Sequence, residues 1–178
     1  MRKLFIASIA SLFISTSAFA EDIKIGIILG FTGPIESLTP AMAAGAEAAI
    51  AEVSASGQLL SGSTVTAIRA DSTCIDSAVA SANAEKLITA DKVNGIMGAD
   101  CSGVTGAILA NVAMANGMVM ISPSATSPAL STAEDNGLFF RTAPSDARQG
   151  AIMSNVLMDK GITSVAVSYT NNDYGKGL

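Results

Sequence analysis

The sequence contains no histidine, and this absence excludes a Ser-His-Asp catalytic triad. The two cysteines cannot complete a zinc site unless carboxylates join them. The chain has no P-loop, and Gly103-x-x-Gly106 lacks the rest of a dinucleotide-binding fingerprint. Acidic pairs such as Asp71 and Asp76 are available, but nothing sets them opposite each other, and a loop acid or a helix cap explains each. We therefore expect no catalysis, no metal and no cofactor.

Basic residues are scarce and form no cluster. The chain carries 10 Lys and Arg against 15 Asp and Glu. Without Arg2 and Lys3, which lie in the leader described below, eight basic residues remain and the net charge is −7. This balance argues against a nucleic acid or an anionic lipid surface as a partner.

The sequence also has no apolar run long enough for a transmembrane helix, which needs about 20 residues. Its longest apolar run, residues 4–13, follows Arg2 and Lys3 and precedes small residues ending in Phe19-Ala20. This pattern is typical of a cleaved secretory signal peptide over residues 1–20, with the mature chain starting near Glu21. A signal anchor or a lipid anchor is the alternative, but there is no cysteine at the cleavage point.

The only two cysteines, Cys74 and Cys101, are 27 positions apart. In an oxidising compartment an even pair of cysteines typically forms a disulfide. Closing a loop of this length contributes about 3–4 kcal/mol in the chain-entropy model. Export therefore predicts a Cys74–Cys101 disulfide.

Strand-like and helix-like segments alternate after the leader. We expect strands over residues 23–29, 64–70, 93–97 and 118–121, and helices over residues 41–55, 77–90 and 103–115. The strands are nearly continuous in apolar residues, as in a parallel sheet buried on both faces. The alternation predicts an α/β fold with helices flanking a parallel sheet.

The pattern resumes after a polar turn region. We expect a short strand over residues 138–142, a helix over 147–160 and a strand over 162–169. One helix and one strand cannot bury their apolar faces alone. Residues 146–178 either add to the first sheet or, in the interpretation we prefer, begin a second lobe of a longer protein.

Small and hydroxyl residues follow three of the expected strands. The three segments are Gly30-Phe31-Thr32-Gly33-Pro34, Gly98-Ala99-Asp100-Cys101-Ser102 and Ser122-Pro123-Ser124-Ala125-Thr126. Ligands of open α/β sheets bind outside the carboxyl ends of the strands. Ser102 precedes a helical pattern and can be its N-cap, where free N–H groups suit a carboxylate. A plain cap at Ser102 and a plain polar turn at Ser124 and Thr126 remain the alternatives.

A series of motifs also occurs in a fixed order along the chain. The motifs are Thr32-Gly33-Pro34, Gly45-Ala46-Glu47-Ala48-Ala49, Asp71-Ser72-Thr73-Cys74, Asp100-Cys101-Ser102, ISPSATSP at residues 121–128, Phe140-Arg141-Thr142 and Asp173-Tyr174-Gly175-Lys176-Gly177-Leu178. Together they resemble the leucine/isoleucine/valine-binding family, the periplasmic solute-binding proteins of branched-chain amino acid ABC transporters. Each motif is weak alone, and their joint order carries the resemblance.

The resemblance implies a type I periplasmic-binding-protein fold, with two α/β lobes around a cleft. It implies a first ligand-binding lobe over residues 21–143 and the start of a second, truncated lobe over residues 144–178. In this family Ser102 and Thr126 would bind the ligand α-carboxylate. The backbone at Ser124 and Ala125, with the Thr126 hydroxyl, would help to hold the carboxylate and the ammonium group, and Tyr174 would form an aromatic wall.

The resemblance further implies a monomer in the periplasm that delivers an amino acid to a membrane permease. A ligand-sensing domain of a receptor or regulator with the same fold is the alternative, and fold alone does not separate the two. The chain departs from the family pattern at residues 35–38, where some members place a tyrosine near the ligand. The acidic partner that the family uses for the ammonium group lies beyond Leu178.

Overall fold

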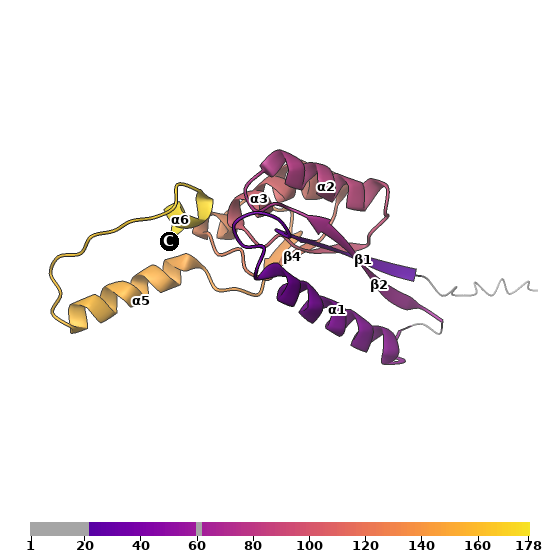
Figure 1. Cartoon of the computed structure of the whole chain (residues 1–178), viewed down its shortest axis with the longest axis horizontal. Coiled ribbons are helices and arrows are strands. Elements are labelled where there is room, and N and C mark those ends of the chain that lie inside the picture. The colour runs from indigo at the N-terminus through magenta and orange to yellow at the C-terminus, as the bar shows by residue number, and fades with distance from the viewer. Residues whose placement is uncertain (1–21, 60–61) are drawn as a thin grey trace, which may run out of the picture.

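A five-stranded, wholly parallel sheet organises the protein, with strand order β2-β1-β3-β4-β5 (Figure 1). The computed structural model describes residues 22–59 and 62–178, so the expected signal peptide lies outside the described residues. The strands are β1 (Asp22–Leu29), β2 (Thr64–Asp71), β3 (Gly95–Gly98), β4 (Met120–Ser122) and β5 (Phe139–Arg141). The α/β class and the parallel sheet predicted from the alternation are confirmed.

Helices cover both faces of the sheet (Figure 1). They are α1 (Thr39–Ala55), α2 (Ser77–Thr89), α3 (Ser102–Ile108), α4 (Met114–Asn116), α5 (Asp146–Asp159) and α6 (Asp173–Gly177). A π-helical turn (Leu109–Ala113) joins α3 to α4, and a 3-10 turn (Pro128–Ser131) follows β4. The single helix expected over residues 103–115 is therefore a helix with a widened π turn in its middle.

Side chains of β1 divide the apolar core between the two faces of the sheet. Ile28 packs with Leu87 of α2 and Ile108 of α3 in the larger cluster. Ile27 and Leu29 point the other way and pack with Ala43 of α1, because successive side chains of a strand alternate between faces. Burial on both faces explains why the strand is apolar at consecutive positions.

Gly98 ends β3 at a position that accepts no side chain. Its φ of +134° lies in a region that L-residues rarely adopt, and an added Cβ would lie 2.1 Å from the carbonyl oxygen of Ile28. Glycine therefore lets β3 run against β1 up to the last residue of the strand. The turn that leads to Asp100 starts from this close approach.

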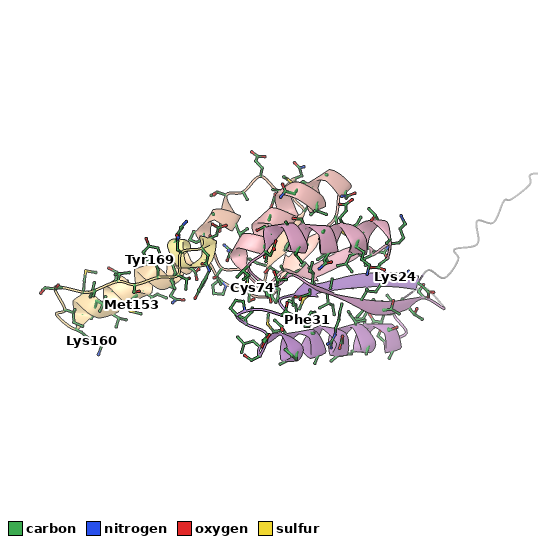
Figure 2. The ribbon with its side chains drawn as sticks, turned by 45° about the horizontal axis from the view of Figure 1, so that its top comes forward. Lys24, Phe31, Cys74, Met153, Lys160 and Tyr169 are labelled. Atoms are coloured by element: carbon green, nitrogen blue, oxygen red, sulfur yellow. A yellow bond between two sulfur atoms is a disulfide. The ribbon has the colours of Figure 1, made fainter. Side chains whose placement is uncertain are left out.

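The segment after β5 leaves the sheet. Helix α5 projects from the body, and an extended strand-like segment returns from its end to α6 (Figures 1 and 2). The strand expected over residues 162–169 is wrong: this segment forms no β-ladder, and Val167 is 80% exposed. Within residues 22–59 and 62–178, no neighbouring strand shares the backbone hydrogen bonds of this segment. The sheet ends at β5, so residues 146–178 do not add to it.

Candidate functional site

The loops that follow the parallel strands meet at one edge of the sheet, and Asp100 joins three of them. Its carboxylate accepts hydrogen bonds from the backbone amide of Gly30 at 2.7 Å, from the Ser72 hydroxyl at 3.2 Å and from its neighbour Cys101 N–H at 3.0 Å. Asp100 is only 3% exposed. The sequence reasoning did not single out Asp100; an acid directly after a buried Gly-Ala pair was the signal available.

The predicted disulfide lies beside this junction. Cys74 and Cys101 are bonded, with their Cα atoms 5.2 Å apart. The bond ties the loop after β2 to the start of α3, and Figure 2 shows Cys74 at the strand ends, toward the projecting arm. Both cysteines are therefore withdrawn from metal binding and from nucleophilic chemistry.

The loop after β1 is held by Asp71 at the end of β2. The Asp71 carboxylate accepts hydrogen bonds from the Thr32 hydroxyl, from the Thr32 amide at 3.2 Å and from the Thr73 amide at 2.8 Å. Burial raises the pKa of Asp71, but these bonds together outweigh it and leave the pKa below its ordinary value. Asp71 therefore acts as a charged anchor of the loop.

Ser102 lies where the loops after β3 and β4 meet, but it is not the helix cap that we expected. The N-cap of α3 is Cys101, and Ser102 is the first residue inside the helix. Its hydroxyl oxygen instead accepts hydrogen bonds from the backbone amides of Thr126 at 3.2 Å and Ser127 at 3.1 Å. The side chain serves two backbone amides of this loop, whereas the N-cap residue Cys101 makes no side-chain cap hydrogen bond.

Hydroxyl groups fix the loop after β4 from its interior. The Ser122 hydroxyl donates to the carbonyl of Ala99 and accepts from the amide of Ala125 at 2.9 Å. The Ser124 hydroxyl donates to the carbonyl of Asp100 at 2.9 Å. Ala125 is fully buried. The serines that end the apolar strand thus fasten the loops after β3 and β4 to each other, and Ser122 has a role that sequence reasoning missed.

Thr126 presents a buried hydroxyl oxygen that has no hydrogen-bond partner within the described part of the chain. One carboxylate oxygen of Asp146 shares this condition. Both residues line a pocket of about 330 Å³, and most of the remaining lining comes from α5, including Ile152 and Val156. Buried polar atoms normally have partners, so an unpaired pair in one pocket marks a place where a donor or acceptor is missing.

Tyr174 lies apart from the four other candidate residues, on the short helix α6. It is 45% exposed. Its helix packs against α3 and the loop after β4: a Cβ on Gly103 would lie 3.4 Å from the Asp173 carboxylate, and one on Gly177 would lie 3.1 Å from the Ser127 hydroxyl. The fold thus connects Ser102, Ser124, Ala125 and Thr126 by hydrogen bonds and packing, and brings only the helix of Tyr174 to the same edge.

Two negative observations apply to residues 22–59 and 62–178. No group of three or more His, Cys, Asp or Glu side chains is arranged to hold a metal ion. No helix in these ranges has the length and hydropathy needed to cross a membrane.

Solved structures share this architecture. The branched-chain amino acid transporter substrate-binding protein LivJ of Streptococcus pneumoniae, solved in complex with isoleucine, matches 79% of this chain and 39% of its own, with a TM-score of 0.69 and 32% identity. A substrate-binding protein of Desulfitobacterium hafniense in complex with Leu matches 88% of this chain and 44% of its own, with a TM-score of 0.72 and 26% identity.

The curated sequence relatives are amino-acid-binding proteins, like the solved structures above. The Leu/Ile/Val/Thr-binding protein of Salmonella typhimurium is 32% identical over 99% of this chain and 47% of its own length. The Leu/Ile/Val-binding protein of Escherichia coli K12 is 30% identical over the same shares. The chain spans about half the length of the curated relatives it matches. Residues 22–178 match the family model described as periplasmic binding protein, and the chain therefore belongs to the periplasmic binding protein family.

Proposed function

We propose that the protein is the substrate-binding component of an ABC importer and binds a branched-chain or related amino acid. The buried, unpaired Thr126 hydroxyl at the carboxyl edge of the sheet carries the proposal, in a chain whose relatives bind Leu, Ile and Val. An amino acid supplies both partners that such a hydroxyl can use, because its carboxylate accepts a hydrogen bond and its ammonium group donates one.

Ser102 and Thr126 bind the α-carboxylate of the ligand in this proposal. The Ser102 oxygen already accepts two backbone amides, which occupy both of its lone pairs. Its own O–H is therefore the group left to donate, and a carboxylate is a suitable acceptor. The backbone at Ser124 and Ala125 helps to hold the two charged groups, and Tyr174 forms an aromatic wall that belongs to the second lobe.

The remaining parts of the proposal concern the whole protein. Residues 1–20 are a signal peptide that is cleaved on export to the periplasm. Residues 21–143 form the first lobe, and residues 144–178 begin a second lobe that closes on the ligand by a hinge motion. The exposed apolar side chains of α5 and of the segment after it, among them Met153 and Val165, support this division. The protein acts as a monomer without catalysis and passes its ligand to a membrane permease.

Ligand binding by the full gene product tests the proposal. We expect one or more of leucine, isoleucine and valine to raise the melting temperature, because a ligand at a hundred times its Kd adds about 2.7 kcal/mol of stability. Thr126→Val keeps the shape of the side chain and removes the hydroxyl, and should weaken binding roughly 10- to 100-fold, as for a hydrogen bond to a charged group.

Thr89→Val is the matched control, because the Thr89 hydroxyl donates to the Glu85 carbonyl at the exposed end of α2. The Thr89→Val variant should bind the ligand with the same affinity as the unmodified protein. Failure of every amino acid to shift the melting temperature would contradict the proposed ligand class. Equal loss in both variants would remove Thr126 from the site.

A further inference from the structure

Arg141, the last residue of the edge strand β5, reaches back to the loop that carries Thr126. Its Nη1 donates to the carbonyl of Ala125 at 3.2 Å and to the carbonyl of Ser127 at 2.8 Å, and its Nη2 donates to the Ser131 hydroxyl. The two carbonyls flank Thr126 in the chain. One guanidinium therefore holds the backbone on both sides of the unpaired hydroxyl.

The residues that follow Arg141 hold the same loop. The Thr142 amide donates to the Ser122 carbonyl at 3.1 Å, and the Asp146 amide donates to the Thr126 carbonyl at 3.0 Å. Segment 141–146 thus binds the carbonyls of the loop after β4. The amides of Ala125, Thr126 and Ser127 in the same loop donate to the hydroxyls of Ser122 and Ser102.

No carboxylate competes for the Arg141 guanidinium in the part of the chain that the structure describes, where the recorded ion pair is Arg69 with Glu47. All three of its recorded bonds go to the loop and to the turn after it. The guanidinium is planar and fixes the direction of its donors, so it sets the geometry of its acceptors better than an ammonium group does. Hydrogen bonds from a charged donor are also stronger than neutral ones.

We propose that Arg141 is a positioning residue for ligand binding: it fixes the backbone at Ala125 and Ser127 so that the Thr126 hydroxyl faces the ligand. Arg141 acts through the loop and does not touch the ligand. This inference rests on the proposed function, because the loop is the proposed binding site.

The test compares Arg141→Met, Arg141→Lys and Ser131→Ala in the full gene product, with leucine and isoleucine as probes in calorimetric titrations. Arg141→Met keeps much of the apolar stem and removes every donor, so we expect Kd to rise about 10- to 50-fold. Arg141→Lys restores a charged donor and should recover part of the affinity. Ser131→Ala removes one of the three bonds and should cost about 2- to 5-fold.

Arg69→Met is the matched control, because Arg69 of β2 pairs with Glu47 of α1 and lies 5.4 Å from the centroid of the Phe31 ring, and neither partner belongs to the loop after β4. Its Kd should stay within twofold of the unmodified protein. Equal affinity in Arg141→Met, or an equal loss in Arg69→Met, would overturn the positioning role. If Arg141→Met does not fold, the Kd values of Arg141→Lys and Ser131→Ala decide. A raised Kd in these variants supports the proposal, and an unchanged Kd in both overturns it.

Hydrogen exchange of the free protein separates this inference from the proposed function. The amides of residues 125–127 should exchange at least tenfold faster in Arg141→Met, while the amides of β1 stay protected as in the control. If the protein binds no amino acid but Arg141→Met still loses amide protection at residues 125–127, the proposed function is contradicted. The positioning of the loop by Arg141 is then still supported. Unchanged exchange at residues 125–127 contradicts the positioning role, whatever the ligand.

Discussion

The carboxylate of Asp100 accepts a hydrogen bond from the backbone amide of Gly30 at 2.7 Å, across 70 positions of sequence. This bond fastens the loop after β3 to the loop after β1. The same side chain accepts from the Ser72 hydroxyl, so the ends of three neighbouring strands share one acceptor group. The carboxyl edge of the sheet is therefore a connected structure, and the loop that carries Thr126 is attached to it through the Asp100 carbonyl.

Asp100→Asn should destabilise the protein. The amide keeps one acceptor oxygen but places an NH₂ group against N–H or O–H donors that the carboxylate now satisfies. We expect a loss of about 2–4 kcal/mol in the free energy of unfolding, measured by urea denaturation. Glu52→Gln on the exposed surface of α1 is the control and should change stability by less than about 0.5 kcal/mol. Equal stability of Asp100→Asn and the control would refute the central role of Asp100.

Two glycine substitutions should have opposite effects. Gly98→Ala places a Cβ 2.1 Å from the Ile28 carbonyl oxygen at a φ of +134°, so we expect a cost of about 3 kcal/mol or more, or failure to fold. Gly45→Ala lies within α1 with no atom within 4 Å of the new Cβ, and should stabilise by about 0.5–1 kcal/mol. Thermal unfolding of the two variants measures both changes in stability. A Gly98→Ala variant as stable as the unmodified protein would disprove the close approach of β3 to β1.

Stability should fall in acid partly through Asp71. Its folded-state pKa lies below the ordinary value of 3.8, so its charged form contributes stability that is complete above that pH and is lost as the pH falls through the folded-state value. Asp71→Asn should therefore lower the free energy of unfolding by roughly 1 kcal/mol at pH 7. The difference in stability from the unmodified protein should shrink once the pH falls below the ordinary pKa of 3.8. Urea unfolding at pH 7 and in acid checks this, and a difference that grows in acid would reverse the assigned sign.

Reduction of the Cys74–Cys101 disulfide should destabilise the protein by about 3–4 kcal/mol, because it releases the loop between two cysteines 27 positions apart. Paired Cys74→Ser and Cys101→Ser substitutions should give a similar loss in unfolding experiments. Mass spectrometry after alkylation should find no free thiol in the exported protein unless a reductant is added. Two alkylated cysteines without reductant would contradict the bond.

Limited proteolysis should find the projecting arm first. Lys160 directly follows α5 and is exposed, and the segment after it forms no ladder (Figure 2). We expect trypsin to cut the present chain after Lys160 before it cuts at Lys24 or Arg69 in the sheet, because exposed backbone outside regular structure is cleaved most readily. In a longer product with the proposed second lobe, the same bond should be protected. Early cleavage within β1 or β2 would contradict the stability assigned to the sheet.

Much of the fold could be predicted because its determinants are local. Consecutive apolar residues separated by helical patterns indicate buried parallel strands, and positive φ at Gly57, Gly117 and Gly161 fits the helix ends expected there. The disulfide followed from the leader and the cysteine count. The strand expected over residues 162–169 was wrong because β-propensity alone does not make a strand, which also needs a neighbour to complete its hydrogen bonds.

The sequence by itself determined the order of strands and helices, the hydroxyl residues at the carboxyl edge and the cysteine pair, since these depend on pattern and composition. Only the tertiary structure decided that Ser102 binds the amides of Thr126 and Ser127 rather than capping its helix, and that Asp100 and Arg141 fix the loops. The bonds of Asp100 with Gly30, of Ser102 with Thr126 and of Arg141 with Ser127 join residues 70, 24 and 14 positions apart. The packing of five strands sets such distances, and local sequence patterns carry no record of them.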